Sequence, residues 1–110
     1  MGDKSVTGSG ARNTSGTGTG TVINSSMLGV TLNMTAVSGV AASLVLSVQW
    51  SADGTTFGAA DPPDAFTAVT ATGVVVKSFA AKAPFYRLAW AITGTTPSFT
   101  FKADAFEYGG

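Results

Sequence analysis

The stretch "SLVLSVQWSADGTTF", from Ser43 to Phe57, decides the fold of this chain. Its first half places apolar residues at every second position, as in an extended strand with one face against a core. The dipeptide Asp53-Gly54 follows, and this pair is among the strongest short signals for a turn between strands. The stretch therefore predicts a half-buried β-strand that ends in a turn. The face expected to be buried carries Leu44, Leu46, Val48 and Trp50.

Asp53 is a candidate either for ligand binding or for closing that turn. An aspartate can accept hydrogen bonds from backbone N–H groups two residues further on, which closes an Asx-turn. The spacing resembles the Asp-box of sialidases and related β-propellers, Ser-x-Asp-x-Gly-x-x-Trp. It has one residue fewer between Asp and Gly, and the motif does not repeat along the chain. We therefore predict that Asp53 turns the chain, with calcium or sugar binding as the alternative.

The same period of two recurs in three further segments, residues 27–37, 84–93 and 98–107. Two shorter and less regular segments, 65–72 and 74–80, lie between them. Turns marked by Gly and Pro, among them "VSGVAA" and "TGTTP", are expected to separate the segments. This pattern predicts an all-β fold, a single antiparallel β-sandwich or jelly roll of about seven to eight strands. An up-and-down barrel is the alternative. The residues expected to face the core are Leu28, Val30, Leu32, Met34, Tyr86, Leu88, Trp90, Ile92, Phe99, Phe101, Ala103 and Ala105.

The N-terminal segment has a different composition, because residues 5–21, "SVTGSGARNTSGTGTGT", are almost entirely Gly, Ser and Thr. Such a segment cannot bury enough apolar surface to fold alone. We expect a flexible arm over residues 1–21 and a β-sandwich domain over residues 22–110. The arm is either a disordered tail or a segment that becomes ordered along a neighbouring subunit, where it would add a strand to that subunit's sheet.

Composition excludes several classes of function. The 110 residues include no His and no Cys, which removes Ser-His-Asp and Cys-His nucleophiles, imidazole bases and disulfides. Charged residues make up only 11%, and six basic and six acidic side chains cancel. Nucleic-acid binding therefore has no electrostatic basis. No signal peptide or membrane span is visible, so we expect a soluble protein made in a cytoplasm.

The few acidic residues do not form a recognisable catalytic or metal site. The segment "GAADPPDAF" is expected to be a loop stiffened by two prolines, with Asp61 and Asp64 in solvent. Both could approach Asp53, but the alternating acidic pattern of a calcium loop is absent. Asp104 and Glu107 have opposite strand parity, so they point to opposite faces and cannot flank one glycosidic bond. We therefore predict no enzyme activity, no catalytic residue, no metal and no cofactor.

Four residues are candidates for contact with a partner: Arg12, Arg87, Phe106 and Tyr108. Arginine is favoured at subunit interfaces. Arg87 lies among apolar residues on the face opposite Trp90, and its alternative role is to cover Phe85 with its stem. Phe106 and Tyr108 share the face opposite Phe101, where they can anchor a partner.

The segments "VQWSADGTTF", "FYRLAW" and "ITGTTPSFTFKADA" together resemble small structural proteins from the head and tail regions of tailed bacteriophages. The resemblance covers residues 28–107 and rests on turn and core motifs. It implies a non-enzymatic virion protein, assembled in the host bacterial cytoplasm, that decorates and cements a capsid. Its expected partners are the major capsid protein or other virion subunits and further copies of itself, with no nucleic acid and no membrane. The alternatives are a tail- or fibre-associated module and a carbohydrate-binding β-sandwich.

Overall fold

The computed structural model describes residues 2–18 and 20–109, with backbone alone at residues 2–11 and 62. The described chain is all-β and forms one antiparallel sheet of seven strands, which confirms the predicted fold class. The strands are β1 (Gly2–Arg12), β2 (Gly16–Thr17), β3 (Thr21–Val22), β4 (Met27–Ser51), β5 (Gly58–Ala65), β6 (Gly73–Ala80) and β7 (Phe85–Tyr108).

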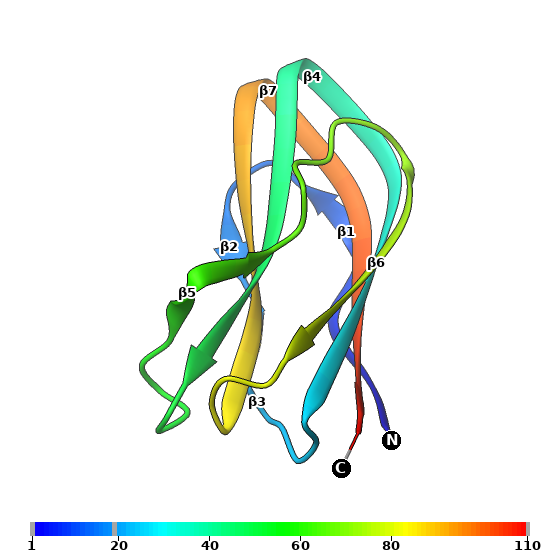
Figure 1. The fold of residues 1–110 in the computed structure, drawn as a ribbon. Coiled ribbons are helices and arrows are strands. Elements are labelled where there is room, and N and C mark those ends of the chain that lie inside the picture. Colours follow the sequence, from blue (N-terminus) through cyan, green and yellow to red (C-terminus); the bar gives the residue numbers. More distant parts are fainter. Residues whose placement is uncertain (1, 19, 110) are drawn as a thin grey trace.

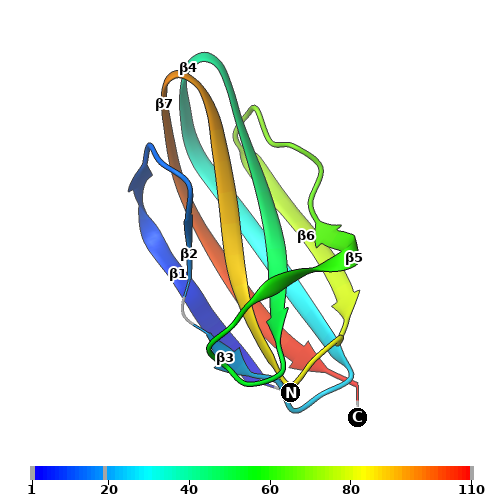
Figure 2. The ribbon, with the colours of Figure 1, turned by 90° about the vertical axis from the view of Figure 1, so that its left-hand side faces the viewer.

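The two longest strands, β4 and β7, form the frame of the molecule. They pair along their whole length, from Met27 opposite Tyr108 to Ser51 opposite Phe85. This ribbon folds over near its middle, so that its two halves lie in different layers (Figure 1). In the first layer β6 and β1 flank the ribbon, and in the second layer β5 flanks one side and β2 and β3 the other (Figure 2). The result is a sandwich-like fold.

The bend in the ribbon depends on residues with positive φ. Gly39 and Ala41 in β4 have φ of 114° and 52°, and Gly94 and Thr96 in β7 have φ of 123° and 49°. Register shifts accompany these residues, between Met34 and Ala36 and again through residues 38–43. The segments "VSGVAA" and "TGTTP", expected to be turns between separate strands, are therefore bends inside two continuous strands.

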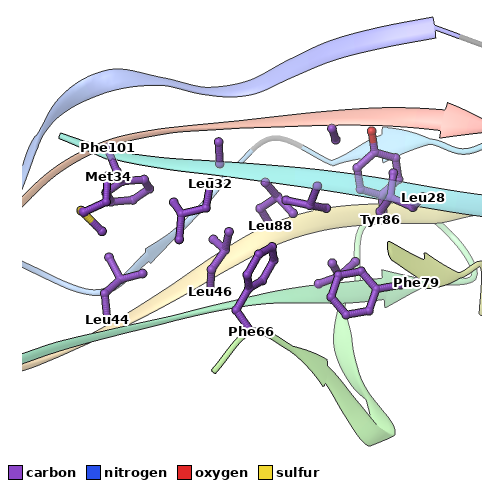
Figure 3. Packing of buried hydrophobic residues seen from close by; sticks show 14 of the residues in the cluster. Leu28, Leu32, Met34, Leu44, Leu46, Phe66, Phe79, Tyr86, Leu88 and Phe101 are labelled. Atoms are coloured by element: carbon purple, nitrogen blue, oxygen red, sulfur yellow. The ribbon is translucent and has the colours of Figure 1, made fainter. Parts of the chain in front are cut away.

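The core lies between the two layers and follows the predicted alternation. Each layer contributes one half of β4 and the paired half of β7, and the apolar side chains of the two layers face each other across the interior (Figure 3). Phe66 and Phe79 close the core beside β5 and β6. Trp90 and Ile92 differ from the prediction, because both are only half-buried. The predicted core residues that are buried are Leu28, Val30, Leu32, Met34, Leu44, Leu46, Val48, Trp50, Tyr86, Leu88, Phe99, Phe101, Ala103 and Ala105.

The N-terminal segment pairs within its own chain, which the sequence did not predict. The backbone of β1 runs antiparallel to β7, from Gly2 opposite Glu107 to Arg12 opposite Phe99. The two short strands β2 and β3 pair with the other half of β7. Strand addition requires only main-chain hydrogen bonds, which a Gly- and Thr-rich segment supplies. We expected a disordered tail or a strand added to a neighbouring subunit, whereas the backbone of this segment pairs with the chain's own β7.

Two predictions between residues 58 and 72 are wrong. The segment "GAADPPDA", expected to be a loop, is strand β5, with a register shift where Gln49 pairs with Ala59 and Val48 with Asp64. The two prolines lie in the bulge between these pairs. Proline lacks the N–H that a regular ladder needs, so it is tolerated at such a bulge. The expected strand over residues 65–72 is reduced to one isolated bridge, between Leu44 and Val69.

Candidate functional site

The turn at Asp53 is a closed hydrogen-bonded unit. Asp53 Oδ1 accepts hydrogen bonds from the backbone N–H groups of Thr55 and Thr56, each at 2.9 Å, and from Ser51 Oγ at 2.9 Å. Ser51 Oγ in turn accepts from Gly54 N at 2.8 Å. These donors, Thr56 first, hold the pKa of Asp53 well below its usual range. The predicted Asx-turn is confirmed, and the carboxylate is used to hold the turn.

Asp53 makes the turn sensitive to acid, and the D53N variant tests this. A carboxyl group with a lowered folded-state pKa stabilises the fold above its unfolded-state value, 3.8, and this contribution is lost as pH falls through the folded value. We expect the melting temperature of the native chain to fall more steeply below pH 4 than that of D53N. Thermal melts from pH 2 to pH 6 measure the difference. D61N, which alters an exposed carboxylate outside the turn, should keep the native slope.

Asp64 occupies a different environment from the solvated loop carboxylate that the sequence predicted. Its Oδ2 accepts a hydrogen bond from Trp50 Nε1 at 2.9 Å and forms an ion pair with Lys82 Nζ at 3.0 Å. Lys82 Nζ also lies 5.7 Å from the centre of the Trp50 ring. The bulged strand β5 brings Asp64 to the indole, so the carboxylate holds an edge of the second layer in place.

The acidic residues that the sequence singled out do not come together. Asp104 is half-buried and lies 3.6 Å from Lys102 Nζ on its own strand, whereas Glu107 is buried and accepts a hydrogen bond from Asn24 N at 2.8 Å. The prediction that Asp104 and Glu107 face opposite sides is confirmed. Among the described residues no group of three or more Asp or Glu side chains is placed to hold a metal ion.

Arg12 closes one open side of the sandwich. Its guanidinium lies 5.1 Å from the centre of the Trp90 ring and 4.6 Å from that of Phe101, and Nη1 donates to the Phe101 carbonyl at 3.2 Å. Trp90 and Phe101 belong to different layers and meet edge-on, with centroids 5.7 Å apart. Strand β2 passes over the Trp90 ring, since a Cβ on Gly16 would lie 3.0 Å from it. Arg12 therefore joins the end of β1 to both layers.

Arg87 is also held by its own chain, on the outer face of the second layer. Its Nε donates to Gln49 Oε1 at 2.7 Å, and its guanidinium lies 4.6 Å from the centre of the Phe57 ring. Gln49 is its direct partner across the β4–β7 ladder, so the bond joins neighbouring strands. The structure pairs the Arg87 head with Phe57, whereas the sequence suggested that its stem covers Phe85.

Phe106 and Tyr108 do form one aromatic surface, on the outer face of the first layer. Their ring centres are 5.9 Å apart and their planes are inclined by 27°. Phe106 lies across Gly29 on the neighbouring strand, where any Cβ would collide with its ring. Both side chains are half-buried. They share no surface with Arg87, which lies on the opposite layer.

Tyr86 is an interior group whose pKa is shifted by its surroundings. Its side chain is fully buried, and this burial, together with the negative charge of Glu107, raises its pKa to about 12. Thr21 lies near enough to lower the pKa slightly, but no described atom forms a well-aligned hydrogen bond with the phenol oxygen. The hydroxyl is therefore kept protonated in the folded state.

The Y86F variant isolates the effect of this phenol at high pH. A raised folded-state pKa means that stability falls as pH rises from the unfolded value, 10.0, to about 12. A shift of this size corresponds to about 2–3 kcal/mol at pH 12 and above. Y86F should lose less stability than the native chain across this window and differ little at pH 7. Urea denaturation at pH 7, 10 and 11.5 checks the prediction, and parallel curves would contradict it.

Sequence reasoning missed one surface, the outer edge of the first layer. In β6 three consecutive valines, Val74, Val75 and Val76, are 63%, 42% and 59% exposed. The signal was present in "VVVKSFA", because a strand without alternation is either covered on both faces or left open at an edge.

Two shallow depressions near the bend are lined by small or neutral side chains with Arg12 as the single charged residue among those described.

These observations define an all-β, sandwich-like protein whose described charged groups mostly hold strands and turns together. No family model, curated protein or solved structure matches the chain. The described residues include no helix long and apolar enough to cross a membrane.

Proposed function

We propose that this chain is a non-enzymatic structural protein of a tailed-bacteriophage virion that decorates the outside of the capsid. Its partners are the major capsid protein or other virion subunits, together with further copies of itself. It reinforces the lattice through many weak contacts multiplied by the number of copies.

The observation that carries the proposal is that the charged side chains described above hold the strands and turns of their own chain together. Arg12, Arg87, Asp53 and Asp64 each contact their own chain, as described above. What is turned outward is an edge strand with exposed valines and faces rich in Ser and Thr. Such a surface suits docking through backbone and apolar contacts rather than catalysis. The resemblance of residues 28–107 to phage head and tail proteins supports the same assignment.

Quantitative mass spectrometry of purified particles from the source of this chain tests the proposal. We expect hundreds of copies per particle, comparable with the number of shell subunits. A few copies would instead favour the tail- or fibre-associated alternative. Absence of the chain from particles would contradict the virion assignment as a whole.

A second function, carbohydrate binding, is favoured by one observation. Phe106 and Tyr108 form an aromatic pair on an outer face, with ring planes inclined by 27°, and aromatic faces of this kind can stack against sugar rings. Binding to a glycan array that is lost in Y108A would favour this candidate. Y108A is the better test, because Phe106 also packs on Gly29.

A further inference from the structure

The edge strands of this sheet differ in how well they are protected against pairing with another chain. Natural proteins protect such edges with bulges, prolines, charges or very short strands. The β5 edge is interrupted by a register shift and carries Asp61 and two prolines. The β1 ladder has two register shifts, and β2 and β3 are two residues long each.

Strand β6 has none of these interruptions. It pairs with β4 over eight consecutive positions without a register shift, from Gly73 opposite Met34 to Ala80 opposite Met27. No other described strand pairs with it, so its outer edge presents a regular row of N–H and C=O groups. Val74, Val75 and Val76 give this edge a high β-propensity, and all three are exposed.

The one charge on β6 does not protect the edge, because it is held against its own chain. Lys77 Nζ donates to the Ala65 carbonyl at 2.7 Å and lies 5.7 Å from the centre of the Phe79 ring. This contact joins β6 to the end of β5 across the open side of the sandwich. The edge from Gly73 to Val76 is left apolar and uncharged.

We propose that a second copy of this chain docks here, with its β6 pairing antiparallel to the first β6 about a twofold axis at Val75. A twofold interface uses the same surface on both copies, which suits a strand whose apolar part is symmetric about one residue. In this register Val75 faces its own equivalent and Val74 faces the partner's Val76. In this register, side chains that point to the same side of the sheet lie opposite each other across the axis. The core-facing sides of the two β6 strands therefore form one continuous face.

Charge placement selects this register over its neighbours. With the axis at Val75, Lys77 lies opposite the partner's Gly73, and the two lysines are about 14 Å apart at 3.4 Å per residue. This separation exceeds the screening length of about 8–10 Å in physiological salt. An axis at Lys77 would place the two ammonium groups opposite each other and would pair the three valines with the partner's Ser78, Phe79 and Ala80 rather than with the partner's valines.

The absence of cysteine from the chain provides a direct test. Directly opposite residues in an antiparallel pair have Cα atoms about 4.5–5.5 Å apart, within the range that a disulfide spans. V75C should therefore form a disulfide-linked dimer with oxidised glutathione and revert to monomer with a reductant. V40C is the matched control, since Val40 is 71% exposed at the bend, away from β6. Cross-linking of V75C no faster than that of V40C would overturn the proposal.

A second measurement does not depend on a new thiol. Light scattering coupled to size-exclusion chromatography should show dimers of the native full-length chain at high concentration. V74K/V76K should shift the population to monomers, whereas V40K should not, and circular dichroism should show that both variants are folded. A native chain that stays monomeric at every concentration, or a V74K/V76K variant that still dimerises, would overturn the proposal.

This inference deepens the proposed function, on which it rests for its biological role. The two can fail separately. A dimer through β6 in a chain absent from particles would contradict only the virion assignment, and an abundant particle protein without the V75C cross-link would contradict only the β6 interface.

Discussion

Replacing Phe101 with alanine is expected to lower the free energy of unfolding by about 3–5 kcal/mol, the range for truncating a buried phenylalanine. Phe101 is fully buried, and its ring contacts Trp90 from the other layer and the guanidinium of Arg12. The variant would leave a cavity between the layers and remove the surface on which Arg12 rests. Urea denaturation at neutral pH measures the loss.

The matched control is F106A, which removes the same side chain from the same strand on the opposite face. Phe106 is half-buried and lies over Gly29 outside the core. We expect F106A to cost clearly less than F101A, since less apolar area returns to water. Equal losses of unfolding free energy in F101A and F106A would contradict the assignment of Phe101 to the core-facing side of β7 and of Phe106 to its outer side.

Replacing Gly94 with alanine is expected to destabilise the bend by at least about 1–3 kcal/mol, the cost of a strained backbone conformation. Gly94 has a φ of 123°, and an added Cβ would lie 2.8 Å from Ala42 Cα on the facing strand. Gly39 mirrors it, with a φ of 114° and an added Cβ 2.8 Å from Pro97 Cα. G39A/G94A should lose roughly twice as much, a large fraction of the about 5–15 kcal/mol by which a domain is stable, and should melt at a clearly lower temperature than G94A. Thermal melts followed by circular dichroism measure both variants.

Gly58 provides the control for this prediction. An added Cβ there would meet no atom within 4 Å, and its φ lies outside the left-handed region. G58A should therefore melt at or slightly above the native temperature, since alanine restricts the unfolded chain more than glycine does. If G94A melted at the same temperature as G58A, the folding over of the β4–β7 ribbon would not depend on Gly94.

The candidate site residues were harder to predict than the strands. The sequence offered Arg12 and Arg87 as contacts for a partner, because arginine is favoured at subunit interfaces. In the structure Arg12 contacts Phe101, which lies 89 positions away in the sequence, and Arg87 contacts Gln49, which lies 38 positions away. Asp64 was likewise expected in solvent, but the β5 bulge brings it to Trp50.

Sequence alone determined the all-β class, the faces of the long strands and the turn at Asp53. These features depend on residues within a few positions of one another, through the period of two and the Asx-turn. Tertiary structure alone decided that β4 and β7 pair from end to end, that "VSGVAA" bends one strand rather than joining two, and that β1 lies on its own β7. Those outcomes depend on pairs as distant as Met27 and Tyr108. The hydrogen bonds of such a ladder join main-chain groups, which are the same in every residue, so the local sequence does not specify which strands pair. The pairing is decided only when the side chains of the whole core pack together.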